Sequence, residues 1–356
     1  MDNVVSFGSE AHRRHARALL WPVLPLAAAG WWVVGALPWI VDGLGARSPR
    51  DWTSDLESGS VASGYLSLLP FTPARMGLLL VVTLVGGLAA AVATLWLRPR
   101  EGRTLARAGV AALGTLAAAA YTVAQSAGAT RQLGSDFDRD DRVLVGVLVV
   151  ATVGMVAGLL LGLVVVLGRP VPRALAAAPL AVALGSWVGA LAVALFGTQR
   201  ALPVLGWTTT LTAVLAGLAL ASVGVRSLGR VLVWPSVLAI VAACTAAQTA
   251  LSYVTGYLRP RSGLPNGLRA HLEAGRDVFV RALQPEFQPW GAYAVTVAVG
   301  LVGTGVLWLR SHPRNRTGAD PQRPAVASAA APAVSPADVP ADLPAGGDEQ
   351  VDATAR

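Results

Sequence analysis

Two short polar blocks interrupt long apolar stretches, and they are the first residues in this sequence with a pattern suited to chemistry. Each block closes one of two similar segments, Arg107 to Ala127 and Arg230 to Ala250, which both end in Thr-x-Ala-Gln-Ser/Thr-Ala. Residues at i, i+3 and i+4 share one face of a helix. Each block therefore presents an amide and two hydroxyls together: Thr122, Gln125 and Ser126 in the first block, and Thr245, Gln248 and Thr249 in the second.

A buried amide needs a hydrogen-bond partner, so both faces are predicted to point into a helix bundle and away from lipid. Two uses follow: contact with a substrate along a pathway, or hydrogen bonds between helices. Gln125 lies about 27 Å beyond Arg107 at a rise of 1.5 Å per residue. That depth is near a membrane boundary, whereas transporter sites usually lie near the midplane, so depth favours a packing role.

A third group of candidates follows Pro265 and Asn266, where the sequence predicts an amphipathic helix near 266–283. An apolar stripe and a charged stripe run along this segment at helical spacing. The charged side could contact lipid headgroups or a protein partner at the outer face, or it could supply an acid or base. Its candidate residues are Arg269, His271, Glu273, Arg276, Asp277 and Arg281.

Metal and cofactor motifs are not found in the sequence, so we expect neither a metal site nor a cofactor. The loop from Asp136 to Arg142 begins like a calcium-binding loop, but Asp141 stands where the loop needs Gly and Val147 where it needs Glu. The single cysteine, Cys244, has no second cysteine with which to form an intrachain disulfide. We interpret the acidic loop as solvated.

The composition is that of a polytopic membrane protein. Hydrophobic residues make up 54% of the 356 residues and charged residues only 13%, against about a quarter charged in soluble domains. The net charge is +8, and every Lys/Arg position is an arginine because the chain has no lysine. These arginines separate apolar segments and do not cluster on one soluble face, so no nucleic-acid partner is predicted.

Apolar windows of about 20 residues predict an all-α fold with about eight transmembrane helices. Arginine-rich short connections place both chain ends on the cytoplasmic side of the cell membrane. The predicted regions are a basic N-terminus at 1–17, a helical bundle at 18–310 with outer loops at 42–74, 128–142 and 253–289, and a disordered Pro/Ala-rich cytoplasmic tail at 311–356. The predicted helices are 18–41, 76–97, 108–127, 143–167, 174–196, 207–225, 231–252 and 290–309.

The similarity of the two polar blocks raises the hypothesis of a 4+4 internal repeat with both halves in the same orientation. Gly30-Trp31-Trp32-Val33 and Gly185-Ser186-Trp187-Val188 agree with that pairing. Arg17 and Trp21-Pro22, however, resemble Arg230 and Trp234-Pro235, which pairs the wrong members. Chance similarity between apolar helices therefore stays open beside duplication.

Three functions remain open from the sequence. The first is a permease-like or transport-associated protein for a small or amphiphilic envelope molecule. The second is a scaffold or assembly subunit that meets a protein partner through the outer helix or the tail. The third is a membrane enzyme acting on a lipid-linked substrate, with His271, Glu273 or Asp277 as acid or base. Because the predicted spans contain no Asp, Glu, Lys, Arg or His, coupling through an intramembrane carboxylate is not expected.

Overall fold

The computed structural model describes residues 21–45, 66–72, 75–96, 104–134, 142–225, 227–257 and 268–311. The predicted N-terminus at 1–17, most of the acidic loop and the tail beyond Ser311 lie outside the described residues. The chain divides into two units, Met1–His312 and Pro313–Arg356. All described helices belong to the first unit.

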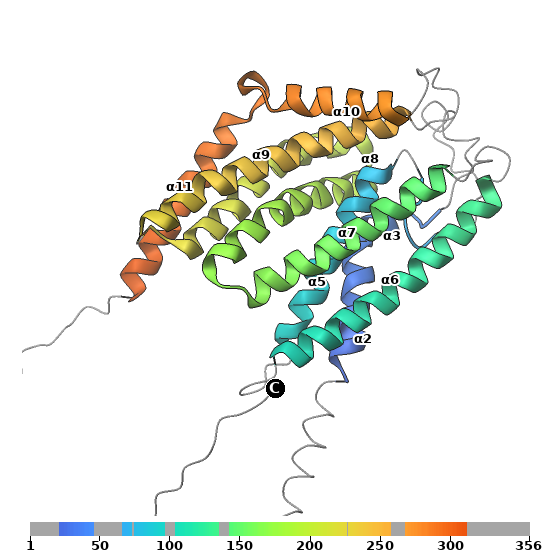
Figure 1. Ribbon diagram of the computed structural model, residues 1–356, viewed down its shortest axis with the longest axis horizontal. Coiled ribbons are helices and arrows are strands. Elements are labelled where there is room, and N and C mark those ends of the chain that lie inside the picture. Colours follow the sequence, from blue (N-terminus) through green and yellow to red (C-terminus); the bar gives the residue numbers. More distant parts are fainter. Residues whose placement is uncertain are drawn as a thin grey trace, which may run out of the picture. The chain divides into compact units, whose positions relative to one another are not determined.

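The described residues are mostly helical, which confirms the predicted all-α class. Six of the helices are long and apolar enough to cross a membrane, which suggests a membrane protein. They are α5 (Met76–Trp96), α6 (Thr104–Gly134), α7 (Arg142–Leu167), α8 (Pro170–Val223), α9 (Leu228–Tyr257) and α11 (Trp290–Ser311) (Figure 1).

The first predicted helix, 18–41, is not continuous over its described part. It consists of α2 (Val23–Ala29), a π-helical turn η1 (Gly30–Val34) and α3 (Leu37–Val41). Pro38 has no N–H to donate to the carbonyl one turn earlier, and Ala36 has non-helical dihedrals of φ −83° and ψ 4°. This stretch is therefore a broken helix, and its apolar part is too short to count among the six.

The predicted helices 174–196 and 207–225 are joined in α8, because residues 197–206 add helical turns in place of the predicted loop. The exception is Gly197, whose φ of 74° and ψ of 163° suit glycine and turn the chain back on itself. The two arms then run antiparallel: the Thr212 hydroxyl donates to the Ala181 carbonyl at 3.4 Å. The difference between eight predicted helices and six observed ones arises here and at the broken first helix.

Glycines bring α5 and α7 into backbone contact. A Cβ placed on Gly87 would lie 2.2 Å from the Gly158 carbonyl carbon, and one placed on Gly158 would lie 2.7 Å from the Leu84 Cα. The small-residue spacing Gly154, Gly158 and Gly162 is typical of such packing in membrane helices. The second arm of α8 and α11 meet in the same way, since a Cβ on Gly217 would lie 2.7 Å from the Thr296 carbonyl oxygen.

The predicted amphipathic helix is α10 (Leu268–Ala282), and it packs lengthwise against α9 (Figure 1). Its contact is close, because a Cβ on Gly275 would lie 2.7 Å from Val254. The predicted apolar stripe faces α9 in part, because Gly275 is buried against α9 whereas Leu272 is 61% exposed. The stripe was predicted to contain Leu268, Leu272, Gly275, Phe279 and Leu283.

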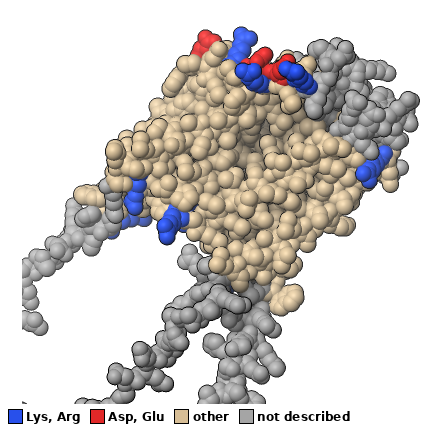
Figure 2. Space-filling model, in the orientation of Figure 1, with Lys and Arg blue, Asp and Glu red and all other residues tan. Residues whose placement is uncertain are grey.

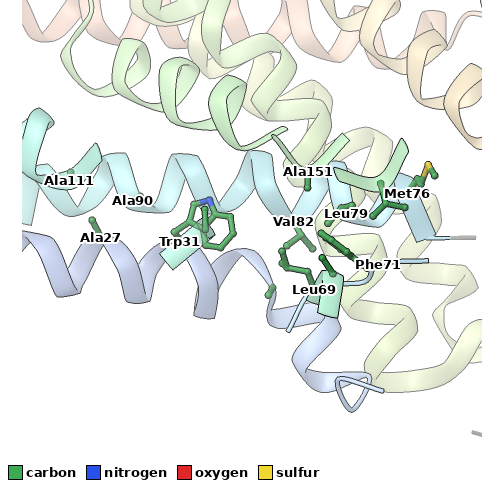
Figure 3. Packing of buried hydrophobic residues seen from close by; sticks show 14 of the residues in the cluster. Ala27, Trp31, Leu69, Phe71, Met76, Leu79, Val82, Ala90, Ala111 and Ala151 are labelled. Carbon is green, nitrogen blue, oxygen red and sulfur yellow. The ribbon is translucent and has the colours of Figure 1, made fainter. Parts of the chain in front are cut away.

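A short non-helical segment, Leu66 to Thr72, is packed into the core beside α5. Leu69 and Phe71 are almost fully buried and lie next to Leu79 and Val82 of α5 (Figure 3). The same cluster includes Trp31 of the broken first helix. The segment therefore belongs to the folded bundle, although it was predicted as part of a long outer loop.

The visible face in Figure 2 carries its described charged residues near its edges, with a broad band free of charge between them. One group of charges belongs to α10, which lies along the second half of α9. We call the end of the bundle at which α9 ends and α10 begins the α10 end. Arg230, at the start of α9, marks the opposite end, called the Arg230 end. This distribution is typical of a protein whose middle faces hydrocarbon.

The Gly87–Gly158 contact predicts that Gly158→Ala destabilises the fold. The added methyl group would overlap α5, and overpacking of this kind costs about 1–3 kcal/mol. Thermal unfolding of the detergent-purified protein measures the loss. The matched control is Gly128→Ala in α6, where a Cβ meets nothing within 4 Å. Equal midpoints for the two variants would contradict the backbone contact.

Candidate functional site

The first polar block binds the non-helical segment 66–72. The Gln125 side chain accepts a hydrogen bond from the Leu68 N–H at 2.9 Å and donates one to the Leu66 carbonyl at 2.7 Å. The Ser126 hydroxyl accepts from the Leu69 N–H at 2.9 Å. Thr122 is buried and donates to carbonyls of its own helix. This block therefore has a structural role.

Two tryptophans of the first helix complete the partners of this segment. Trp32 Nε1 donates to the Leu68 carbonyl at 3.1 Å, and Trp39 Nε1 donates to the Ser67 carbonyl at 2.8 Å. With the remaining turn and side-chain bonds, every backbone N–H and carbonyl from Ser67 to Thr72 has a partner. Irregular backbone can therefore be buried here without an unpaired group.

Gln248 of the second block has different surroundings. Its Oε1 accepts a hydrogen bond from the Ser186 hydroxyl at 3.1 Å, and both residues line a cavity of about 620 Å³. We call it the polar cavity. It lies among α3, α5, both arms of α8, and α9, and its lining residues are Pro38, Asp42, Arg75, Gly77, Leu78, Leu80, Val81, Ser186, Gly189, Ala190, Val193, Ala194, Leu205, Thr208, Gln248, Leu251, Ser252 and Thr255.

The charges of the polar cavity cancel. Asp42 and Arg75 are its charged lining residues and form an ion pair with each other. The Arg75 guanidinium also lies 5.2 Å from the centre of the Trp39 ring, a cation–π distance. The other polar lining groups are hydroxyls and the Gln248 amide. Such a site suits an uncharged or zwitterionic ligand that forms hydrogen bonds and also has apolar parts.

One hydrogen bond joins the wall of this cavity to the broken first helix. Trp187, next to Ser186 on α8, donates its indole N–H to the Gly35 carbonyl at 2.9 Å. Gly35 follows the π-helical turn, where the regular helical ladder is disturbed. The break in the first helix thus coincides with a polar contact to α8.

Thr245 and Thr249 point away from the polar cavity. They line a second cavity of about 300 Å³ between α9 and α10, together with Arg281. Arg281 lies 5.9 Å from the centre of the Phe287 ring. The two predicted polar faces therefore do not meet around one shared space: Gln125 and Gln248 have separate surroundings, and Thr245 and Thr249 have a third.

The charged set on α10 includes one ion pair. Arg269 Nε donates to Glu273 Oε1 at 2.9 Å, and both side chains are largely exposed. Arg276 and Asp277 are exposed, whereas His271 is half-buried. Within the part of the chain that the structure describes, no group of three or more His, Cys, Asp or Glu is placed to hold a metal ion.

The four hydroxyl-bearing residues that line the polar cavity were not predicted as site residues: Ser186, Thr208, Ser252 and Thr255. A signal for two of them exists in the sequence, because Gln248, Ser252 and Thr255 stand at i, i+4 and i+7 and share one helix face. Ser186 and Thr208 lie on other helices, and only the folded arms of α8 bring them to Gln248.

Comparison of the chain with protein-family models, with curated proteins and with solved structures found no match. What the structure defines is therefore a class: an all-helical protein with six helices long and apolar enough to cross a membrane.

The different surroundings of the two glutamines predict different responses to the same change. Gln125→Leu leaves the Leu68 N–H without its partner and should lower the free energy of unfolding by about 1–3 kcal/mol. Gln248→Leu removes one bond to Ser186 beside an open cavity and should have a smaller effect. The midpoints of thermal unfolding of the two purified variants measure both losses of stability. A larger loss for Gln248→Leu would overturn the structural role given to Gln125.

Proposed function

We propose that the protein is a permease-like, multi-pass protein of the cell membrane that binds a small amphiphilic molecule in the polar cavity. The observation that carries this proposal is the cavity itself, which joins uncharged hydrogen-bonding groups with apolar walls. Its volume of about 620 Å³ falls within the range of about 300–1,000 Å³ typical of small-molecule sites. The paired charges of Asp42 and Arg75 favour a ligand without net charge.

The proposed topology has eight membrane crossings with both chain ends in the cytoplasm. The broken stretch from α2 to α3 counts as one crossing and the two arms of α8 count as two. The Arg230 end then faces the cytoplasm, in agreement with the arginines of the short connections. The polar cavity opens toward the α10 end and therefore toward the outside.

Helix packing supports the hypothesis of two similar halves. In the first half, α5 and α7 run parallel and meet through Gly87 and Gly158. In the second half, the second arm of α8 also runs parallel to α11, and the two meet through Gly217. The polar cavity has walls from both halves, as in transporters with parallel repeats. The different surroundings of Gln125 and Gln248, however, also agree with a chance similarity between the two polar blocks.

A scaffold is the second candidate, and the exposed side of α10 favours it. Leu272 and Val280 are 61% and 51% exposed on this helix, beside the exposed Arg276 and Asp277. An exposed helix face that mixes apolar side chains with charges suits a protein partner or the membrane surface. For the enzyme hypothesis, Glu273 is already paired with Arg269.

Thiol labelling tests transport without knowledge of the substrate. In a Cys244→Ala background, Ser186→Cys places one thiol in the wall of the polar cavity. A permease exposes this position alternately to each side. We therefore expect a membrane-impermeant methanethiosulfonate reagent to label it when added to either side of oriented proteoliposomes.

Thr83→Cys is the matched control, because Thr83 is fully buried in α5 and should stay unlabelled from both sides. Labelling of Ser186→Cys from the outside alone would contradict alternating access and favour the scaffold.

Dihexanoylphosphatidylcholine, a small zwitterionic amphiphile, should slow the labelling of Ser186→Cys from the outside. When Gln248→Leu is combined with Ser186→Cys, this amphiphile should no longer slow the labelling. If it still slows the labelling fully, Gln248 does not belong to the binding site.

A further inference from the structure

A third cavity, of about 660 Å³, lies at the Arg230 end of the bundle, away from the polar cavity. It is bounded by the end of α8 and its turn at Gly224, by the start of α9, and by the last turns of α11. We call it the Arg230 cavity. It shares no lining residue with the polar cavity, so a ligand bound in one does not touch the residues that line the other.

Arg230 is the charged residue that lines this cavity. Its Nη1 donates to the Val223 carbonyl at 3.3 Å, at the end of α8. A guanidinium has five N–H donors and no acceptor, so one such bond leaves most of its donors for another partner. Among the described lining residues there is no aspartate or glutamate. Arg230 is thus a half-buried cation without an acidic neighbour in its own cavity.

The hydroxyl groups of this cavity are used within their own helices. Ser222 donates to the Ala219 carbonyl at 2.7 Å, and Thr304 donates to the Gly300 carbonyl at 2.8 Å. Neither hydroxyl donates into the cavity. An anion entering it would therefore depend on the Arg230 guanidinium for strong hydrogen bonds.

The remaining walls are apolar and face outward from the bundle. Leu301, Leu307 and Trp308 of α11 are each more than half exposed, and Val225 stands on the opposite side. On a membrane-spanning helix such a surface is in contact with lipid chains, and a tryptophan near a helix end is typical of the headgroup level. The cavity therefore combines one cation with a wall suited to acyl chains.

We propose that the Arg230 cavity binds an anionic phospholipid, with its phosphate on Arg230 and an acyl chain along Leu301, Leu307 and Trp308. The charge requires an anion, and the apolar walls distinguish a lipid from free phosphate. Basic pockets between membrane helices are a known way to hold anionic headgroups. The site is independent of the polar cavity, and it requires no transport.

Lipid retention by the full-length protein tests this assignment. Protein purified in detergent is incubated with dioleoylphosphatidylglycerol, with dioleoylphosphatidylcholine or with inorganic phosphate, and bound molecules are counted by native mass spectrometry. We expect retention of the phosphatidylglycerol alone. Arg230→Gln should weaken it about tenfold, while Arg131→Gln, at an exposed arginine in the last turn of α6, should leave it unchanged.

A second variant separates lipid binding from folding. Gly305 lines the cavity, and a Cβ there meets nothing within 4 Å, so Gly305→Leu should fill the apolar wall without strain and reduce retention while Arg230 stays intact. Gly291→Leu, equally open at the other end of α11, is its control. Unchanged retention in both Arg230→Gln and Gly305→Leu would overturn the site. Binding of inorganic phosphate without the lipid would replace a lipid site with a free-anion site.

Discussion

Backbone groups that are buried away from water must be hydrogen-bonded, and this requirement organises the α10 end of the bundle. The backbone groups of a helix bond to one another. The segment from Ser67 to Thr72 is not helical, so it has no such ladder of backbone hydrogen bonds. Its N–H and carbonyl groups are instead paired by Gln125 and Ser126 from α6 and by Trp32 and Trp39 from the first helix. Polar side chains inside apolar helices are here the means by which an irregular segment is buried.

The same requirement explains why two similar polar blocks have different roles. In α6 the block faces a stretch of backbone that needs partners, so the Gln125 amide and the Ser126 hydroxyl both form hydrogen bonds with that backbone. In α9 the block faces a helix whose backbone is already paired, so Gln248 meets only a serine hydroxyl and borders an open space. Among the described residues, no irregular segment occupies the corresponding position beside Gln248, where the polar cavity lies. A sequence motif can therefore be repeated while its function is not.

Much of the helical architecture follows from the sequence, because apolar length and glycine spacing are local properties. The helices near 76–97 and 143–167 are examples. The break near Pro38, the continuation of α8 through 197–206 and the burial of 66–72 were not predicted. Each depends on partners far away in the chain. Among the residues that line the polar cavity, Gln248 was predicted from its pattern, whereas Ser186 and Thr208 required the folded arms of α8.

The central claim is that residues 66–72 are held as firmly as the helices beside them. Hydrogen–deuterium exchange of the protein in lipid nanodiscs measures this directly, because amide exchange reports opening of individual hydrogen bonds. The structure predicts that the Leu68 and Leu69 amides exchange as slowly as those in the middle of α5. Exchange at the rate of a solvated loop would contradict the account.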